Sequence, residues 1–551
     1  MIPASGDAET RESRKARGAF FTPPELCRHM AEWAIRSDAD RVLEPSCGEA
    51  AFLHAAATRM NGLAAPGARP RGRIEGVELH RPSVRAARRL LREQGVPARI
   101  HEGDFFAVEP RPEYDTVIGN PPYVRYQDFT GEARAAARAA ALRGGVRLSA
   151  LASSWAAFTV HAAHFLHPDG RLALVLPAEL LSTNYASEVR RFLMARFAQV
   201  RLVLFTDRVF PEVQEEVVLL LAEGAGPTDH CELHQVTDVA ELAARARVSR
   251  WHPPDPRGKW TPALLDATAL DVYHRLTGDP GFATLHDWGE TTLGAVTGNN
   301  GFFALSQARV DELGLRRSDL LPLSPPGSRH LRRLAFTAAD HEAMRHRDGR
   351  VWLFRPGGAP STAARAYIAR GEAEGVHLAY KCRVRDPWWR TPLVPPPDVF
   401  VTYMNVDTPL LTLNGAGVHH LNSVHGLYLH PGVDPRVAAL LPVASLNSLT
   451  LVGAETVGRA YGGGMLKLEP READRLPVPA PSVVAAAAAT LEAVRPEVLT
   501  ALARGALLEA VAAVDEALLC GFLGVPAADV AALVEAHAHL SARRSARAAS
   551  R

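Results

Sequence analysis

The sequence contains little cysteine and no apolar run of membrane-spanning length. Its 551 residues include five cysteines, which lie far apart and form no CxxC pair. This usage fits a reducing, cytoplasmic environment and argues against a structural zinc site, so no metal is expected. The apolar stretch from Leu172 to Leu181 is interrupted by Pro177 and Glu179, and Met1 to Asp7 contains no basic segment leading into an apolar one. Neither a membrane contact nor a secretory signal is therefore predicted.

Lysine is also scarce, because almost every basic residue is an arginine. The only lysines are Lys15, Lys259, Lys381 and Lys467, and the formal net charge of the chain is +2. An arginine-rich composition of this kind is typical of a GC-rich genome and does not by itself indicate binding to nucleic acid. Evidence for DNA contact must therefore come from local clusters of charge.

Length and patterning indicate more than one domain. With 551 residues, 47% of them apolar and 22% charged, the chain is expected to be globular and to fold as two or three domains. Residues 1–260 alternate short apolar strands with helical patterns, which predicts an α/β domain with a parallel sheet. Residues 261–480 are less regular, and residues 481–551 are expected to form a helical segment with a basic tail. The strands predicted in the first domain are 41–43, 73–77, 116–118, 171–176, 200–205 and 216–221.

The motif Asn120-Pro121-Pro122-Tyr123 is the most informative feature of the chain. It follows the apolar residues 116–119, so it is placed at the end of a buried strand, where open α/β sheets bind their ligands. Proline has no N–H to donate and fixes φ near about −65°, so the carbonyls around the two prolines can point into a site. Asn120 adds a side-chain acceptor, and Tyr123 adds a flat ring able to stack on a base. The motif favours methyl transfer to an amino nitrogen.

Three further segments of the first domain suit a nucleotide-like cofactor. Residues 42–53 are typical of a strand, a tight turn and a helix start, in which Glu44 can accept from an amino or hydroxyl group. Glu78 ends the next predicted strand, where its carboxylate can accept from both hydroxyls of a ribose. Asp104 and Phe105 then offer an acceptor for an adenine amino group and a ring that packs on the base.

Taken in order, these segments resemble the TaqI-type (γ-class) N6-adenine DNA methyltransferases. Residues 17–24 resemble the family's opening cofactor motif, and residues 44–48 its glycine turn, although this chain lacks the second glycine common there. Residues 297–303 and 461–470 resemble segments of the family's target-recognition domain. By this resemblance the cofactor-binding residues are Phe21, Thr22, Pro23, Glu44, Pro45, Cys47, Gly48, Glu78, Asp104, Phe105 and Asn120. The residues at the reacting base are Asn120, Pro121, Pro122, Tyr123 and Phe210, the last of which a core position would also explain.

The resemblance implies an architecture and an activity. It implies a class I, Rossmann-like, S-adenosylmethionine-dependent methyltransferase domain at 1–260, a mixed α+β target-recognition domain at 261–480 and a helical segment at 481–551. The implied reaction is methylation of the N6 amino group of adenine in double-stranded DNA, with the base flipped out of the duplex and no covalent enzyme intermediate. A cognate restriction endonuclease would then be a separate protein of the same restriction–modification system.

Other substrates remain open at this point. The Asn-Pro-Pro-Tyr motif also occurs in methyltransferases of RNA and of protein glutamine side chains. Methylation of the N4 amino group of cytosine is chemically similar, because that amine is presented in the same way. The length of the chain and the order of its motifs favour adenine in DNA.

One basic cluster in the second half suits contact with DNA. The segment 381–390 interleaves guanidinium groups with indoles, which suits phosphate clamping and groove contact. The residues expected to contact DNA are Lys381, Arg383, Arg385, Trp388, Trp389 and Arg390. A solvated surface of an arginine-rich protein is the alternative, and it explains the plainer basic run 328–333 almost as well. Histidines recur at 161, 164 and 167, but helix-surface histidines are commoner than metal ligands.

Overall fold

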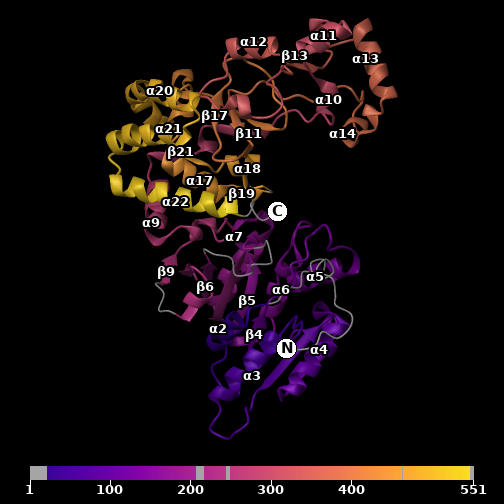
Figure 1. The fold of residues 1–551 in the computed structure, drawn as a ribbon, viewed down its shortest axis with the longest axis vertical. Helices are drawn as coiled ribbons and strands as arrows, with labels where there is room; N and C mark the ends of the chain where they lie inside the picture. Colours follow the sequence, from indigo (N-terminus) through magenta and orange to yellow (C-terminus); the bar gives the residue numbers. More distant parts are fainter. Residues whose placement is uncertain (1–21, 206–215, 244–247, 462, 547–551) are drawn as a thin grey trace, which may run out of the picture. The chain divides into compact units, whose positions relative to one another are not determined.

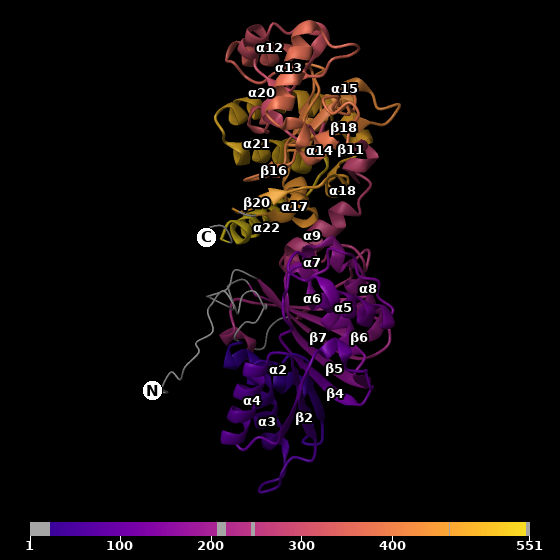
Figure 2. The same ribbon diagram turned by 90° about the vertical axis from the view of Figure 1, so that its right-hand side faces the viewer.

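The computed structural model describes residues 22–205, 216–243, 248–461 and 463–546. The chain forms two compact units, Met1–Leu264 and Leu265–Arg551. Figures 1 and 2 show both units as ribbons coloured along the sequence. The first unit contains one large sheet, whereas the second contains several small antiparallel sheets and many helices.

One nine-stranded sheet organises the first unit, with the strand order β3-β2-β1-β4-β5-β7-β6-β8-β9. The neighbours from β3 to β5 are parallel, and so are β6 and β8. Strand β7 runs antiparallel to β5 and β6, and β9 runs antiparallel to β8. The strands are β1 (Arg41–Glu44), β2 (Arg73–Glu78), β3 (Ala98–Glu102), β4 (Tyr114–Gly119), β5 (Leu166–Pro177), β6 (Phe197–Phe205), β7 (Val217–Ala225), β8 (Cys231–Val236) and β9 (Val248–Trp251).

The strand order creates a crevice between β1 and β4. Strands β2 and β3 follow on one side of β1, and β4 and β5 follow on the other. Such a reversal opens a crevice at the carboxyl ends of the two central strands, where open α/β sheets bind their ligands. The strand order therefore brings the end of β1, at Glu44, and the end of β4, at Gly119, to the expected position of a site.

The predicted α/β fold is confirmed, and every strand predicted in the first domain is present. The expectation of a parallel sheet was wrong at β7, which is inserted antiparallel between β5 and β6. Strands β3, β8 and β9 were not predicted. Strand β3 buries only Ile100, and β9 buries only Trp251, so neither shows the apolar alternation by which a strand is recognised.

The helices of the first unit pack against the sheet and one another, and they differ in how much they bury: every residue of α6 is buried. Helix α4 is highly charged and buries only Val84, Ala87 and Leu91, at helical spacing. Helices α2 and α3 pack together and supply part of an apolar core of the unit. The helices are α2 (Pro24–Ala34), α3 (Ala51–Leu63), α4 (Arg81–Glu93), α5 (Gly131–Arg143), α6 (Ser154–Ala163), α7 (Glu179–Ser182) and α8 (Ser187–Arg196).

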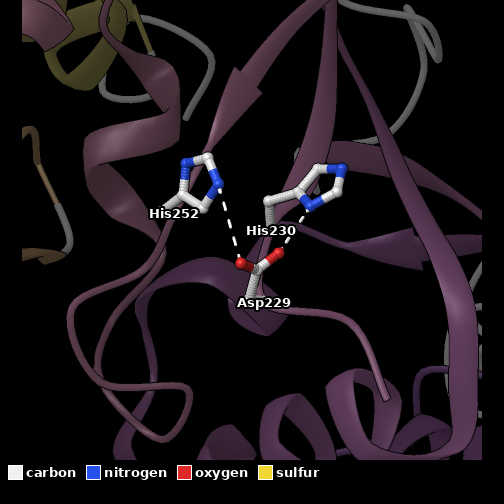
Figure 3. Close-up of side chains that lie close together, drawn as sticks. All are labelled: Asp229, His230 and His252. Atoms are coloured by element: carbon white, nitrogen blue, oxygen red, sulfur yellow. Dashed lines mark hydrogen bonds and ion pairs between the residues drawn. The ribbon is translucent and has the colours of Figure 1, made fainter. Parts of the chain in front are cut away.

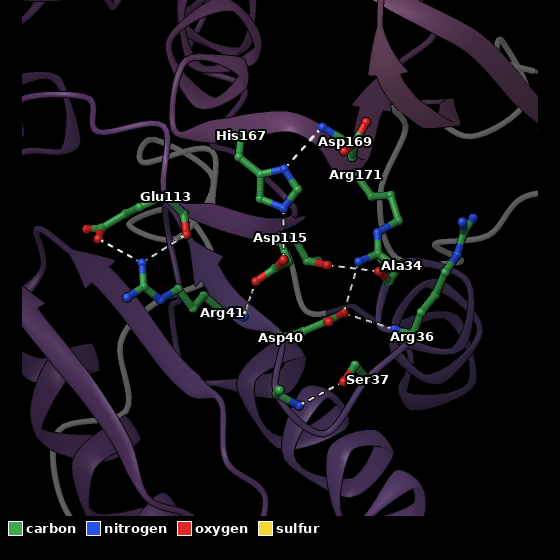
Figure 4. Close-up of polar contacts among 12 residues, drawn as sticks. Ala34, Arg36, Ser37, Asp40, Arg41, Glu113, Asp115, His167, Asp169 and Arg171 are labelled. Carbon is green, nitrogen blue, oxygen red and sulfur yellow. Dashed lines mark hydrogen bonds and ion pairs between the residues drawn. The ribbon is translucent and has the colours of Figure 1, made fainter.

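Polar side chains tie the strands together near the amino-terminal ends of β1 and β4 (Figure 4). Asp40 Oδ2 accepts a hydrogen bond from Arg171 Nη2 at 3.0 Å, and both side chains are buried, with 7% and 8% of their surface exposed. Asp115 accepts from the backbone N–H of Arg41 at 2.7 Å and contacts His167 Nε2 at 2.8 Å. Burial lowers the pKa of Arg171, and the carboxylate of Asp40 opposes that shift. This network holds the strands at the end opposite the crevice.

The second unit is built from four small antiparallel sheets. Their strand orders are β11-β18-β15-β17, β12-β14-β13, β16-β20-β19 and β10-β21. The strands are β10 (Phe282–Thr284), β11 (Gly289–Leu293), β12 (Ala304–Leu305), β13 (Leu320–Pro322), β14 (Trp352–Phe354), β15 (Val399–Thr402), β16 (Met404–Asn405), β17 (Leu411–Leu413), β18 (Val424–Leu429), β19 (Arg459–Tyr461), β20 (Met465–Lys467) and β21 (Pro477–Pro479).

Two main apolar cores fill the second unit. One gathers residues from Leu285 to Leu518, so the carboxyl-terminal helices α20 and α21 share a core with the strands before them. The other surrounds Phe302 and Trp352. The helices are α9 (Ala267–Thr277), α10 (Asn300–Phe303), α11 (Gln307–Leu313), α12 (Ala338–His346), α13 (Thr362–Ala373), α14 (Tyr380–Arg383), α15 (Pro435–Ala438), α16 (Leu441–Ala444), α17 (Ser448–Val457), α18 (Pro470–Ala473), α19 (Pro481–Ala486), α20 (Ala488–Ala503), α21 (Leu507–Val514) and α22 (Ala527–Ala546).

Among the residues that the structure describes, no single helix has both the length and the apolar character needed to cross a membrane. One pair of helical segments, Pro435–Ala444 and Ser448–Val457, meets the length and composition test only when joined across an 80° bend.

We predict that Asp40→Ala destabilises the first unit by roughly 3–5 kcal/mol, because it leaves the Arg171 guanidinium buried without its carboxylate. Thermal unfolding of the purified protein measures the effect. The control is Arg81→Ala. The Arg81 side chain is 78% exposed and pairs with Glu102, so its loss should lower the free energy of unfolding by less than about 1 kcal/mol. Equal losses in the two variants would contradict a structural role for the buried pair.

Candidate active site

A cavity of about 440 Å³ lies at the carboxyl ends of β1, β2 and β4. Its volume is typical of small-molecule and cofactor sites. The predicted site residues that line it are Pro45, Gly48, Glu78, Asp104, Phe105, Asn120 and Pro122. Sequence analysis missed other lining residues, among them His80, Phe129, Ser154 and Phe158, since none of them lies in a recognisable motif.

Asn120 follows β4 with its amide group held in one orientation. Its Nδ2 donates to Thr22 Oγ1 at 3.2 Å. Its Oδ1 is buried and has no hydrogen-bond partner among the described residues. A buried acceptor without a partner is costly unless a ligand donates to it. Asn120 therefore presents one available acceptor at the wall of the cavity, and Thr22 orients it.

The other residues of the motif are fixed by the surrounding fold. The Tyr123 hydroxyl donates to the backbone carbonyl of Val175 at 2.9 Å, and its half-buried ring packs against the apolar core. Pro121 is buried, while Pro122 is half-buried and lines the cavity. The end of β5 therefore determines the direction of the Tyr123 ring.

Glu78 holds the turn between β1 and α3. Its Oε2 accepts from the backbone N–H of Gly48 at 2.9 Å, and its Oε1 accepts from the backbone N–H of His80 at 2.7 Å. Each carboxylate oxygen has a second lone pair, so both can still accept from a ligand in the cavity. The backbone of Gly48 is left-handed, with φ of 49°, a conformation that favours glycine.

Glu44 is buried next to Gly119, the residue before the Asn-Pro-Pro-Tyr motif. Only 2% of the residue is exposed, and its Oε2 has no hydrogen-bond partner among the described residues. A Cβ placed on Gly119 would lie 3.4 Å from Glu44 Cγ, which shows how closely the ends of β1 and β4 approach. Burial raises the pKa of Glu44 well above its usual value, and the nearby charge of Glu78 adds to the shift. A ligand that donates a hydrogen bond to Glu44 would stabilise its ionised form.

Four described residues of the predicted cofactor set do not line the cavity: Thr22, Pro23, Glu44 and Cys47. Cys47 is 3% exposed, and its Sγ lies against Gly76 of the neighbouring strand, within the apolar core. Its backbone N–H donates to the carbonyl of Val77 at 3.0 Å, so it shapes the turn through its main chain. Pro23 is the N-cap residue of α2 and is half-buried. Phe21 and Phe210 lie outside the described residues.

Asp104 and Phe105, which follow β3, also line the cavity. Asp104 Oδ1 accepts from the backbone N–H of Phe106 at 2.9 Å, which caps the short turn that follows β3. Phe105 is only 2% exposed and stacks on Phe158 and Phe165 at ring distances of 5.5 Å and 5.1 Å. The turn is therefore rigid because its rings belong to an aromatic cluster.

His161, His164 and His167 do not converge on a common point. His161 is buried, not on the helix surface as expected, and its Nε2 lies 3.2 Å from the carbonyl oxygens of both Phe105 and Val108. Burial lowers the pKa of His161 to about 4, so the neutral ring can donate to these carbonyls. His167 contacts Asp115 instead, as described above.

A different pair of histidines, His230 and His252, lies beside Asp229, where β8 begins and β9 ends (Figure 3). His230 Nδ1 lies 2.8 Å from Asp229 Oδ1, and His252 Nε2 lies 4.0 Å from Asp229 Oδ2. The Asp229 side chain is 82% exposed, and its hydrogen bond with His230 lowers its pKa. The carboxylate is already paired within the group and open to water, so we assign no metal to it.

The predicted DNA-contact segment divides into an exposed part and a structural part. Lys381, Arg383 and Arg390 are exposed. Arg385 is half-buried, and its guanidinium donates to the backbone carbonyls of Val296 and Thr297.

The two tryptophans of the segment also belong to the fold. Trp388 Nε1 donates to Glu372 at 3.0 Å, and its ring lies 5.5 Å from that of Phe302. Trp389 is half-buried against the same apolar core. An exposed ring that was not predicted, Tyr380, lies 5.5 Å from Lys381 Nζ and is 64% exposed.

Two family descriptions match successive parts of the chain. Residues 8–232 match the family described as N-6 DNA Methylase. Residues 257–519 match the family described as the C-terminal domain of the type II methyltransferase M.Eco57I.

Individual relatives match along most of the chain. It is 22% identical over 474 residues to the type II methyltransferase M.AccI of Acinetobacter calcoaceticus, and 25% identical over 482 residues to M.XamI of Xanthomonas campestris pv. amaranthicola. Each alignment covers 84% of this chain and 85% of the relative. The DNA-bound structure of the type IIL restriction–modification enzyme MmeI matches with a TM-score of 0.54 at 13% identity, over 96% of this chain and 76% of that one. This last likeness shows a shared fold.

The missing second glycine of the turn has a structural consequence at Ala50. Ala50 is fully buried, and its φ of 72° is in the left-handed region, which costs a residue with a Cβ roughly 1–2 kcal/mol. We predict that Ala50→Gly raises the stability of the first unit by about 1 kcal/mol, observed as a higher Tm. Ala55→Gly, in the right-handed interior of α3, is the matched control and should lower stability by about 1 kcal/mol. Destabilisation by both substitutions would show that the turn is not strained.

Proposed function

We propose that this chain is a methyltransferase of the N-6 DNA methylase family, which its residues 8–232 match, and that it methylates the N6 amino group of adenine at a specific sequence in duplex DNA. The order of its motifs resembles that of the TaqI-type, γ-class enzymes, and this resemblance supports the choice of adenine. The observation that carries the proposal is Asn120 Oδ1, a buried acceptor without a partner among the described residues, at the carboxyl end of β4.

The acceptors of the catalytic motif act on the amino group of the substrate. The lone pair of an adenine N6 is conjugated into the ring, so the nitrogen is a poor nucleophile. When Asn120 Oδ1 and the Pro121 carbonyl accept hydrogen bonds from its two N–H groups, the nitrogen is drawn toward tetrahedral geometry and its lone pair becomes available. This is catalysis by positioning and electrostatics, without a covalent enzyme intermediate.

The residues around the cavity fit S-adenosylmethionine as the cofactor. Bound there, it would supply a methyl group activated by a sulfonium centre. Glu78 has lone pairs left for ribose hydroxyls, and Asp104 has a second oxygen available for an adenine amino group. Glu44 Oε2, which has no partner among the described residues, suits the amino group of the methionine part, since a cationic donor favours the ionised carboxylate.

An adenine in a duplex cannot reach a site at the end of a strand, so the base must be flipped out. Flipping costs a few kcal/mol, and stacking of the flipped base on an aromatic ring offsets roughly 1–3 kcal/mol of that cost. Tyr123 is the described ring in the catalytic motif that can serve this role, and Phe210 is proposed as the second. The second unit supplies sequence recognition, with the exposed cations of 381–390 binding phosphates.

Other acceptors of the methyl group are distinguished by the product. RNA, a protein glutamine or the N4 of cytosine would use the same two acceptors on an amino nitrogen. Incubation of the protein with S-adenosylmethionine and unmethylated bacterial DNA, followed by long-read mapping of modified bases, tests the proposal. N6-methyladenine at one recurring sequence supports it. N4-methylcytosine, or no modification of DNA by protein that binds the cofactor, contradicts it. A cognate endonuclease, where one exists, would be a separate protein.

We predict that Asn120→Ala reduces methylation to below about 1% of wild type, because one of the two acceptors for the amino protons is lost. DNA affinity should change less than threefold in a fluorescence anisotropy titration, since the second unit supplies most phosphate contacts. Asn61→Ala, at an exposed position of α3, is the control and should retain full activity. If Asn120→Ala lost DNA binding and turnover to the same extent, the assignment of Asn120 to catalysis and of DNA binding to the second unit would be contradicted.

The exposed and structural parts of the basic segment should respond differently to substitution. Replacing Lys381, Arg383 and Arg390 together by Ala should weaken DNA binding at least tenfold and reduce its salt dependence, with Tm unchanged. Arg347→Ala, an exposed arginine just after α12, should leave affinity within twofold of wild type. Arg385→Ala should lower Tm, because two backbone carbonyls lose their donor. Normal DNA affinity in the triple variant would exclude this segment from the DNA interface.

A further inference from the structure

Ser154, the first residue of α6, makes three hydrogen bonds to the catalytic loop. Its Oγ donates to the backbone carbonyl of Pro122 in a short hydrogen bond and accepts from the backbone N–H of Val124 at 2.9 Å. Its own backbone N–H donates to the carbonyl of Val124 at 3.0 Å. Only 1% of Ser154 is exposed, yet the residue also lines the cavity. One side chain therefore bridges both sides of Tyr123.

The loop depends on such external contacts because of its own sequence. Pro121 and Pro122 have no N–H, so neither residue can anchor the loop by donating to a neighbouring strand. Fixing the Pro122 carbonyl fixes the peptide plane that follows it, and proline φ limits how the preceding carbonyl of Pro121 can turn. The hydroxyl of Tyr123, bound to Val175, is a second fixed point but lies at the far end of a side chain.

The start of α6 is itself rigidly placed. Trp155, the next residue, is fully buried, and its Nε1 donates to the Tyr185 hydroxyl at 2.9 Å. The same Nε1 lies 3.3 Å from Glu179 Oε2, and the Tyr185 hydroxyl also donates to that oxygen. Burial and the charge of Glu179 raise the pKa of Tyr185, so its hydroxyl remains a donor. Ser154 therefore offers the loop a support that does not move with it.

We propose that Ser154 is the positioning residue of the methyl-transfer site: its hydroxyl sets the direction of the Pro121 carbonyl relative to Asn120 Oδ1. The proposal rests on the proposed function, because it concerns the two acceptors of the substrate amino group. A shift of about 1 Å in such an acceptor is enough to cost about a hundredfold in rate. Both hydrogen bonds of the Ser154 hydroxyl go to the loop, so we expect its contribution in kcat and not in binding.

The test compares Ser154→Ala with Ser153→Ala, a matched change at the adjacent buried serine. Ser153 is 5% exposed, and its Oγ lies 3.5 Å from Glu179 Oε2, a residue that holds the start of α6. Ser154→Thr keeps the hydroxyl and serves as the rescue variant. For each protein, kcat and KM on duplex DNA, cofactor affinity by calorimetry and Tm are measured at a temperature at which all variants are folded.

We expect Ser154→Ala to lower kcat by 10- to 100-fold, with KM for DNA and cofactor affinity within threefold of wild type. Ser153→Ala should stay within threefold in kcat, and Ser154→Thr should recover most of the lost rate. The proposal is overturned if Ser154→Ala keeps wild-type kcat, or if both alanine variants lose rate in proportion to their loss of Tm. If Ser154→Ala does not fold, Ser154→Thr and Ser154→Cys decide, because the weaker hydrogen bonds of a thiol should leave only the Cys variant slow. A wild-type protein that methylates no DNA would instead refute the proposed function.

Discussion

The parallel pairing of β1 with β4 is the constraint on which the first unit depends. Its register, with Val42 opposite Thr116 and Leu43 opposite Val117, brings Glu44 next to Gly119 at one end of the sheet. Asp40 and Asp115 stand at the other end, where they bind Arg171 and the Arg41 backbone. The pair is thus fixed at its amino-terminal end by buried polar contacts. At its carboxyl-terminal end it leaves two acceptors, on Glu44 and Asn120, without partners among the described residues.

Much of this site could be predicted from the sequence, because its residues lie in short motifs at strand ends. Glu78, Asp104 and Asn120 all line the cavity, since consecutive parallel strands bring their carboxyl ends to one edge. What could not be predicted depends on contacts between distant segments. Cys47 faces the core because Gly76 lies beside it. Ser154 reaches the loop from a helix that begins 32 residues after Pro122.

The number of arginines in the sequence does not by itself indicate which of them can contact DNA, and both units show the physical reason. Several arginines are buried and bind backbone carbonyls instead of facing a polyanion. Arg190 is 1% exposed and donates to the carbonyls of Leu180 and Thr183, while Arg544 is 3% exposed and donates to that of Val406. Arginine can do this because its planar group carries several donors and remains charged when buried. In such a chain, exposure and hydrogen-bond partners separate the arginines that can meet DNA from those that hold the fold.

The two prolines of the Asn-Pro-Pro-Tyr loop also affect the unfolded chain. Proline restricts φ before folding as well as after it, and it restricts the residue that precedes it. Asn120, Pro121 and Pro122 are therefore confined to few backbone conformations even in the disordered polypeptide. Ordering an ordinary residue costs roughly 1–2 kcal/mol of conformational entropy, and these three lose less. The covalent structure of the loop thus carries part of the site's order, and folding has only to supply the remainder.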